Sequence, residues 1–258
     1  MNIDKILGIA ISAAYKSSDI LSGKFGNIEK ISKKGEIDLV TEADLESEKV
    51  IIDHIKSQFP DHSILSEESG EEINNSDYLW IIDPLDGTTN FAHGLGLFAT
   101  SIAFAVKGEV LAGVVLNPIT RELFSAQRGK GSLLNGLPIK VSDSGTVKES
   151  LLVTGFPYDF KTILDPVINR FQSCLTEARG IRRLGAAALD LCYVACGRFD
   201  GFWEQNLKPW DTAAGFLIAE EAGAKVTDFS SSSFLLEKKE ILVTNQKIHE
   251  EMISLLSL

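Results

Sequence analysis

The chain opens with hydrophobic residues spaced three and four positions apart, which predicts an amphipathic helix. They are Ile3, Ile6, Leu7, Ala10, Ala13 and Ala14. A second helix should begin at Thr41, because threonine is a good N-cap and Asp44 follows three residues later, as in a capping box. Its residues expected to face the core are Ile51, Ile52, Ile55 and Phe59. Between the two helices, residues 24–34 contain Gly26 and four lysines and indicate a loop or a flexible hairpin.

Short runs of strand-forming residues follow the second helix. They occupy residues 63–66, 78–82, 100–106, 110–116 and 122–126. Lys107-Gly108 predicts a hairpin between two of these runs, and Asn135-Gly136 is a strong signal for another tight turn. The signals in this part of the chain are therefore largely those of an antiparallel sheet.

Helices and strands alternate beyond about residue 145. The expected helices lie near residues 166–178, 186–196 and 209–222, and a final helix ends the chain. Pro209 suits the first turn of the third of these helices. The expected strands lie at residues 151–154, 199–204 and 241–244. The mixture predicts a protein of the α/β or α+β class.

The composition narrows the class of protein. The 258 residues suffice for one large domain or for two lobes that share a core, and 44% hydrophobic residues are ordinary for a globular protein. A net charge of −11 argues against nucleic acid as the main partner. It does not argue against a phosphorylated substrate, because bound cations reverse the local sign.

The three cysteines lack the spacing of a metal site. Cys192 and Cys196 lie four positions apart in an apolar helical stretch, which favours buried thiols and a reduced, cytoplasmic compartment. We expect neither a signal peptide nor a membrane span. The first five residues lack a basic region, and no stretch approaches eighteen apolar residues.

The most informative motif follows a strand end predicted at residues 80–82. It reads Asp83-Pro84-Leu85-Asp86-Gly87-Thr88. Two carboxylates and the backbone carbonyl of Leu85 are oxygen ligands of the kind that Mg2+ prefers, and a glycine turn lets the next amides face a phosphate. An acidic surface turn is the alternative, since Asp-Pro and Asp-Gly are common turn pairs. The spacing fits neither an EF-hand loop nor the Asp-x-Asp motif of phosphatases that form an aspartyl phosphate.

Four blocks of the chain, in the right order, resemble those of the inositol monophosphatase family. Residues 83–91, DPLDGTTNF, match the first signature of that family, and residues 210–215, WDTAAG, followed by EEAGA at 220–224, match the second. Residues 38–44 and 66–69 match two further blocks. The resemblance extends from about residue 3 to residue 250. The ending TTNF favours the inositol-phosphatase branch over the nucleotide-phosphatase relatives.

The resemblance implies a layered αβαβα sandwich in two lobes, with the active site between them. We expect an N-terminal lobe of residues 1–145, with most metal ligands, and a C-terminal lobe of residues 146–258, with Asp211 and substrate-binding residues. The implied cofactor is Mg2+, with two or three ions per site. The implied ligands are Glu67, Asp83, the carbonyl of Leu85, Asp86 and Asp211.

The resemblance also assigns roles in catalysis. It implies that Asp44, Thr88 and Glu67 activate the attacking water without a covalent intermediate. Taken alone, Asp44 would rather be interpreted as a helix-capping acid. The residues implied to bind the substrate are Asp86, Gly87, Thr88, Gly185, Ala187 and Glu204. Lys33 and Lys34 match a loop near the third metal, and solvated loop charges are an equal alternative. Arg182 and Arg183 could support a phosphate or be structural ion-pair partners, and the structural role is favoured.

The expected activity is hydrolysis of myo-inositol monophosphate to myo-inositol and phosphate. Fructose-1,6-bisphosphate, NADP and histidinol phosphate are alternative substrates for the same chemistry, and residues 155–159 are candidates for shaping the specificity pocket. A binding role in the transcription machinery is an alternative of a different class. The resemblance further implies lithium sensitivity and a homodimer. We expect no membrane association and no direct contact with nucleic acid.

Overall fold

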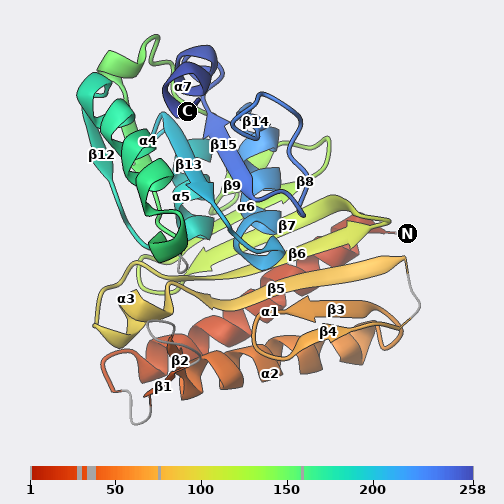
Figure 1. Ribbon diagram of the computed structural model, residues 1–258. Coiled ribbons are helices and arrows are strands. Elements are labelled where there is room, and N and C mark those ends of the chain that lie inside the picture. The colour runs from red at the N-terminus through yellow and green to blue at the C-terminus, as the bar shows by residue number, and fades with distance from the viewer. Residues whose placement is uncertain (1, 28–30, 34–38, 75–76, 158–159, 258) are drawn as a thin grey trace.

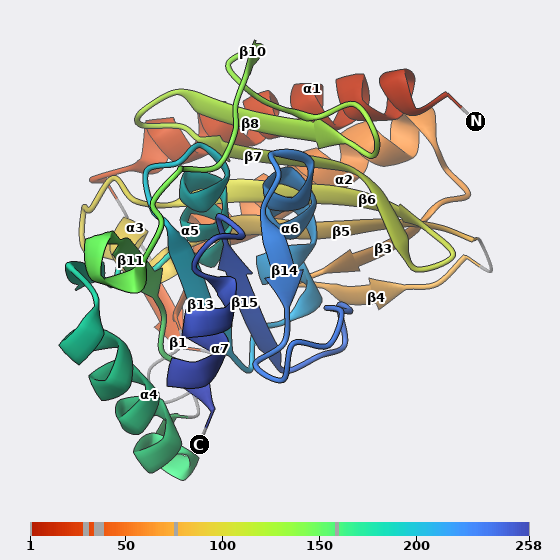
Figure 2. The same ribbon diagram turned by 90° about the horizontal axis from the view of Figure 1, so that it is seen from above.

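The computed structural model describes residues 2–27, 31–33, 39–74, 77–157 and 160–257. Their main helices and strands form five layers in the order helix, sheet, helix, sheet, helix (Figure 1, Figure 2). The αβαβα sandwich predicted from the resemblance is therefore confirmed. The two sheets are built from separate stretches of the chain, because the strands of the larger one all precede those of the smaller one.

The first layer consists of α1 (Ile3–Lys24) and α2 (Glu42–Gln58), which pack together on one face of the larger sheet. Thr41 caps α2, and its amide donates a hydrogen bond of 2.7 Å to Oδ2 of Asp44. This is the capping box predicted from the sequence. The residues expected on the inner face of α2 are buried or partly buried against the sheet: Ile51, Ile52, Ile55 and Phe59.

The larger sheet has eight strands in the order β10-β9-β8-β7-β6-β5-β3-β4. Their bounds are β3 (Ser63–Ser66), β4 (Gly70–Glu72), β5 (Tyr78–Asp86), β6 (Ala99–Val106), β7 (Glu109–Asn117), β8 (Glu122–Gln127), β9 (Ser132–Leu134) and β10 (Leu137–Pro138). Only β3 and β5 pair parallel among these neighbours. The predicted turns are confirmed, since Lys107-Gly108 joins β6 to β7 and Asn135-Gly136 joins β9 to β10, with positive φ at all four residues.

The smaller sheet has five strands in the order β12-β11-β13-β15-β14. Their bounds are β11 (Leu151–Thr154), β12 (Gly180–Arg182), β13 (Gly201–Gln205), β14 (Lys225–Thr227) and β15 (Glu240–Thr244). Helices α5 (Ala187–Ala195) and α6 (Pro209–Glu221) lie between the two sheets. Helices α4 (Leu164–Glu177) and α7 (His249–Leu256) cover the outer face of the smaller sheet.

The shortest elements were not predicted. These are β4, β9, β10, β12, β14 and the single turn α3 (Thr88–Ala92), together with 3-10 turns at Val147–Glu149 and Phe160–Thr162. Elements of two to five residues are too short to show a hydrophobic period. β1 (Ile31–Lys33) lies at the end of the stretch 24–34 that was expected as a loop or hairpin, and it pairs antiparallel with β2 (Leu39–Thr41), beyond that stretch.

Two glycines bring α6 close to its neighbours. A Cβ atom on Gly113 of β7 would lie 2.9 Å from the carbonyl oxygen of Ala214 in α6. A Cβ atom on Gly215 of α6 would lie 2.7 Å from the side chain of Leu191 in α5. Both distances are shorter than real Cβ contacts, so glycine is needed at each position. The close packing seats α6 against the larger sheet and brings its first turn, with Asp211, beside the end of β5.

The cysteines are free thiols, as expected: Cys174 and Cys192 are buried and Cys196 is half-buried. Within the described ranges, no helix combines the length and the apolar content needed to cross a bilayer.

Candidate active site

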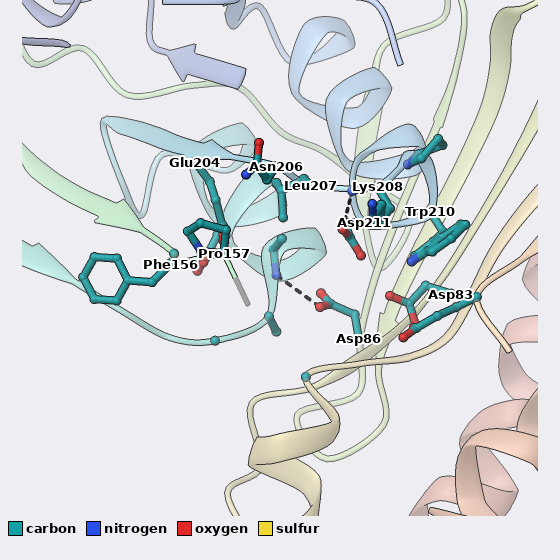
Figure 3. Close-up of a pocket in the computed structure, with 18 of the residues that line it drawn as sticks. Asp83, Asp86, Phe156, Pro157, Glu204, Asn206, Leu207, Lys208, Trp210 and Asp211 are labelled. Carbon is teal, nitrogen blue, oxygen red and sulfur yellow. Dashed lines mark hydrogen bonds between the residues drawn. The ribbon is translucent and has the colours of Figure 1, made fainter. Parts of the chain in front are cut away.

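A cavity of about 620 Å³ lies between the end of β5 in the larger sheet and β13 in the smaller one. Its wall includes every predicted site residue except Asp44. It also includes Gly155, Phe156 and Pro157, from the segment expected to shape a specificity pocket; residues 158 and 159 lie outside the described part. Figure 3 shows the carboxylates of Asp83, Asp86 and Asp211 pointing toward the same region of the cavity.

Asp83, Leu85 and Asp86 lie where β5 departs from regular pairing. The register with β6 shifts between Asp83 and Asp86, so the backbone bulges at Pro84 and Leu85. The amide of Leu85 donates a hydrogen bond of 3.0 Å to Oδ1 of Asp83. The bulge therefore places two acidic side chains, three positions apart in the chain, on the same wall.

Asp86 links the end of β5 to the first turn of α5. Its Oδ2 accepts a hydrogen bond of 2.7 Å from the amide of Ala188, and its Oδ1 accepts one of 3.2 Å from the amide of Ala187. Amides in the first turn of a helix have no partner within the helix and favour a carboxylate. The segment expected to contact a substrate ring, Gly185 to Ala187, therefore also holds Asp86.

Asp211 lies in the first turn of α6, two residues after Pro209. Its Oδ2 accepts a hydrogen bond of 2.6 Å from the amide of Lys208 (Figure 3). Pro209 occupies the start of the helix, as predicted. The helix terminus thus fixes the direction in which Asp211 enters the cavity.

The acidic residues raise one another's pKa values. Burial, followed by the charges of Glu67, Asp86 and Asp211, raises the pKa of Asp83 well above its usual range. Burial, followed by the charge of Asp211, also raises the pKa of Asp86 well above its usual range. Buried carboxylates that repel one another are stabilised by a divalent cation, and Mg2+ and Ca2+ prefer oxygen ligands of this kind.

The carboxylates fit such an ion by donor type and by charge. Each carboxylate oxygen of Asp86 accepts one hydrogen bond from a backbone amide and has a further lone pair that can face a metal. Within the described part of the chain, no three acidic, histidine or cysteine side chains stand close enough to hold an ion in their present orientations. Binding therefore requires the carboxylates to turn toward a common point.

Asp44 lies behind the cavity wall and reaches it through Thr88. The Thr88 hydroxyl lies 3.1 Å from Oδ1 of Asp44 and 3.1 Å from the carbonyl oxygen of Leu85. The other carboxylate oxygen of Asp44 accepts from the amide and the hydroxyl of Thr41. Burial raises the pKa of Asp44, although the hydrogen bonds from Thr41 and Thr88 oppose the shift.

Gly87 forms the turn between the acidic motif and α3. Its φ of 90° is unfavourable for residues with a side chain. A Cβ atom here would also lie 3.0 Å from the carbonyl oxygen of Leu97 and 3.2 Å from Cβ of Ala186. The turn and the close packing both require glycine.

A second polar group of residues lines the cavity away from the acidic motif. Burial, with the charges of Asp211 and Asp86, raises the pKa of Glu204 to about 8, and Arg183 acts in the opposite direction. Asp190 is 1% exposed, and its Oδ1 has no hydrogen-bond partner within the described structure. Burial and the charge of Glu204 raise the pKa of Asp190.

The sequence did not single out Asp190. Arg183, for which a structural role was favoured, lies on the cavity wall. The signal that could have found Asp190 was its spacing. It lies four residues after Ala186, and its amide donates a hydrogen bond to the carbonyl of Ala186, so it stands one helical turn beyond the predicted substrate segment. The role expected for Lys33 and Lys34 stays a prediction. The side chain of Lys33 and the whole of Lys34 lie outside the described part of the structure.

Known proteins resemble the chain along nearly its whole length. The model of the inositol monophosphatase family matches residues 2–257. The chain is 43% identical over 256 residues to the Nus factor SuhB of Pseudomonas aeruginosa, covering 96% of this chain and 94% of that protein. It is 44% identical over 249 residues to the inositol-1-monophosphatase of Synechocystis sp., covering 95% and 86%. The crystal structure of the extragenic suppressor protein suhB from Bartonella henselae superposes with a TM-score of 0.94 at 39% identity, covering 98% of both chains.

Proposed function

The chain belongs to the inositol monophosphatase family, and we propose that it hydrolyses phosphate monoesters of polyols in a Mg2+-dependent reaction, with myo-inositol monophosphate as the preferred substrate. The observation that carries this proposal is the meeting of acidic residues from β5, α6 and the turn after β3 in one cavity, next to the Asp44–Thr88 pair. These acids are Glu67, Asp83, Asp86 and Asp211.

The proposed ligands divide into two groups. Glu67, Asp83 and the carbonyl of Leu85 would hold one ion, and Asp83, Asp86 and Asp211 would hold a second; a weaker third site would lie near Glu67. When bound, the ions would supply positive charge that makes water more acidic and neutralises charge on the leaving oxygen. The amides of Ala187 and Ala188 would keep Asp86 oriented while its other lone pairs face the cavity.

Thr88 and Asp44 would position the attacking water and take up its proton. The Thr88 hydroxyl can donate toward Asp44 or the carbonyl of Leu85 and still accept a hydrogen bond from water. Asp44 is held at both carboxylate oxygens by Thr41 and Thr88, so it stays in place as it gains the proton. Its raised pKa makes it a better proton acceptor than a surface aspartate. No covalent nucleophile is needed.

The two ends of the substrate would meet different groups. The backbone amides of Gly87 and Thr88, at the start of α3, would bind the phosphate. Glu204 would accept hydrogen bonds from ring hydroxyls, and Asp190 offers a further buried acceptor beside it. A polyol supplies many hydroxyl donors, which is why it suits this wall better than a flat aromatic ester does.

Other substrates and one other function are alternatives to this proposal. Fructose-1,6-bisphosphate, NADP and histidinol phosphate would undergo the same chemistry in this cavity. The name of the P. aeruginosa relative supports a second candidate function, a binding role in the transcription machinery. The complete set of cavity acids favours catalysis.

We further propose that lithium inhibits the reaction by displacing a magnesium ion. We also propose that the chain divides into two lobes near residue 145 and that it forms a homodimer. Support for the dimer comes from α4, which exposes Leu164, Ile168 and Leu175. These residues are spaced so that they share one face of the helix.

A panel of phosphate esters, assayed with and without Mg2+, tests the function. We expect the highest kcat/KM for myo-inositol 1-phosphate and no turnover after chelation. At about pH 9, above the pKa of about 8 that burial gives Glu204, Glu204→Gln should lower kcat/KM for that substrate about ten- to a hundredfold, the value of one charge-assisted hydrogen bond, and should spare p-nitrophenyl phosphate. Absence of Mg2+-dependent phosphate release from every ester would refute the proposal. Capture of transcription proteins by the inactive chain would then favour the binding role.

A further inference from the structure

Three buried hydroxyl groups from three different elements meet behind the acidic end of β5. Ser17 lies on α1, Ser47 on α2 and Thr100 on β6, and each residue is at most 1% exposed. Ser17 Oγ lies 2.7 Å from Ser47 Oγ and 2.5 Å from Thr100 Oγ1. Ser47 and Thr100 also lie 2.9 and 3.2 Å from the carbonyl oxygen of Pro84. The four groups form a closed ring between the first helical layer and the larger sheet.

The number of protons restricts how this ring is bonded. Three hydroxyls supply three protons, whereas the ring contains four contacts. The three shortest contacts are all filled if Thr100 donates to Ser17, Ser17 donates to Ser47, and Ser47 donates to the carbonyl of Pro84. The distances therefore favour a directed chain of hydrogen bonds that ends on this carbonyl.

The Pro84 carbonyl belongs to the same planar peptide unit as the amide of Leu85. The carbonyl points away from the cavity toward the hydroxyl ring, and the amide donates to Oδ1 of Asp83 at 3.0 Å. Rotation of this peptide would break both sets of hydrogen bonds. The orientation of the Asp83 carboxylate is thus connected, through one rigid peptide, to hydroxyl groups that do not line the cavity.

We propose that Ser17, Ser47 and Thr100 are positioning residues for metal binding. They hold the Pro84–Leu85 peptide, and through it limit the orientations open to the Asp83 carboxylate and the Leu85 carbonyl, so that less freedom is lost when the carboxylates turn to receive Mg2+. This inference rests on the proposed function, because it assumes that Asp83 and Leu85 are ligands. A cluster that served folding alone would contribute to stability without changing the affinity for the ion.

The test is Mg2+ binding to the substrate-free protein, measured by calorimetry, together with the Mg2+ concentration that gives half-maximal phosphatase activity. Ser47→Ala should raise the dissociation constant about three- to tenfold, within the range of one hydrogen bond. Thr100→Val should raise it about two- to threefold, because the Thr100 hydroxyl acts on the carbonyl through Ser17 and Ser47 or at the longer distance of 3.2 Å. Thr100→Ser keeps the hydroxyl and should restore nearly wild-type affinity. At saturating Mg2+, kcat should stay within about twofold of wild type, because the ligands themselves remain.

Ser150→Ala is the matched control. Ser150 is equally buried and donates to the carbonyl of Thr146 at 2.7 Å, but it does not line the cavity. This change should lower the unfolding temperature without altering Mg2+ affinity. If Ser47→Ala does not fold, the pair Thr100→Val and Thr100→Ser carries the test, since valine has the shape of threonine.

Wild-type Mg2+ affinity in Ser47→Ala and Thr100→Val would overturn the proposal, and so would equal weakening in Thr100→Ser or in the Ser150 control. In those cases wild-type turnover with Mg2+ would leave the proposed function intact. If the wild-type protein itself binds no Mg2+ at millimolar concentration, the proposed function and the positioning role both fail.

Discussion

Gly155→Ala should disturb substrate choice without touching the acidic motif. A Cβ atom on Gly155 would overlap the carboxylate of Glu204, with all three of its atoms well inside the 3.0 Å limit of real Cβ contacts. The backbone of Gly155 has no positive φ, so the alanine introduces a steric conflict and no backbone strain. The carboxylate, which is only 7% exposed, must leave its position on the cavity wall.

The expected loss follows from the displaced hydrogen bond. At about pH 9 Glu204, with its pKa of about 8, is ionised, and a bond from a ring hydroxyl to this carboxylate is worth about 1.5–3 kcal/mol, or about ten- to a hundredfold in kcat/KM. Myo-inositol 1-phosphate should lose this amount, and p-nitrophenyl phosphate should change by less than about threefold. Steady-state kinetics on both substrates at saturating Mg2+ measure the difference.

Gly145→Ala is the control, because a Cβ atom there would meet no atom within 4 Å and its φ is not positive. Equal losses on the two substrates would show that the Glu204 region belongs to the metal or water machinery. No loss on either would show that the Glu204 carboxylate does not contact the polyol. Either result would refute the reasoning.

The remaining predictions concern the ligands, the water and stability. Asp83→Asn and Asp211→Asn should fold but lose more than about tenfold in rate at saturating Mg2+; a smaller loss, under about 1.4 kcal/mol, would exclude them as core ligands. Thr88→Ala combined with Asp44→Asn should be no worse than the poorer single change, since residues that act as a unit are non-additive, and multiplicative losses would contradict a shared role. Burial lowers the pKa of His249 to about 4. The unfolded chain, with a pKa near 6.5, therefore binds the proton first, and stability should fall by up to about 3 kcal/mol as the pH drops from 6.5 to 4. Urea unfolding should show this slope in the wild type and a flatter one in His249→Gln; identical slopes would contradict the assignment.

Most of the regular fold could be predicted from local signals. The capping box at Thr41, the glycine turns at Lys107 and Asn135, and the proline at the start of α6 each depend on residues within one turn of the chain. The acidic motif could also be recognised from local signals. Its two carboxylates lie only three positions apart, and the proline of the bulge lies between them. The sandwich of layers came from the resemblance, since periodicity does not reveal which faces pack together.

Contacts between distant parts of the chain were decided by the tertiary structure. Asp190 was missed because it is the one acidic residue of a helix buried on all sides, and no neighbouring polar residue in the sequence links it to a cavity. The pairing of Gly155 with Glu204 joins positions 49 residues apart, and nothing near either residue indicates that they meet.

By itself, the sequence determined the longer helices and strands, two of the tight turns and the kind of chemistry that the acidic motif can perform. Only the packing of five layers decided that Asp211 enters the cavity beside Asp83, and that hydroxyls from α1, α2 and β6 meet at the Pro84 carbonyl. The physical reason is that a hydrogen bond forms only when two atoms lie about 3 Å apart. In a close-packed interior, the positions of those atoms depend on the volumes of all the side chains packed between the elements that carry them. Local hydrophobic and turn patterns specify the direction of the chain at each step, but they do not specify those volumes.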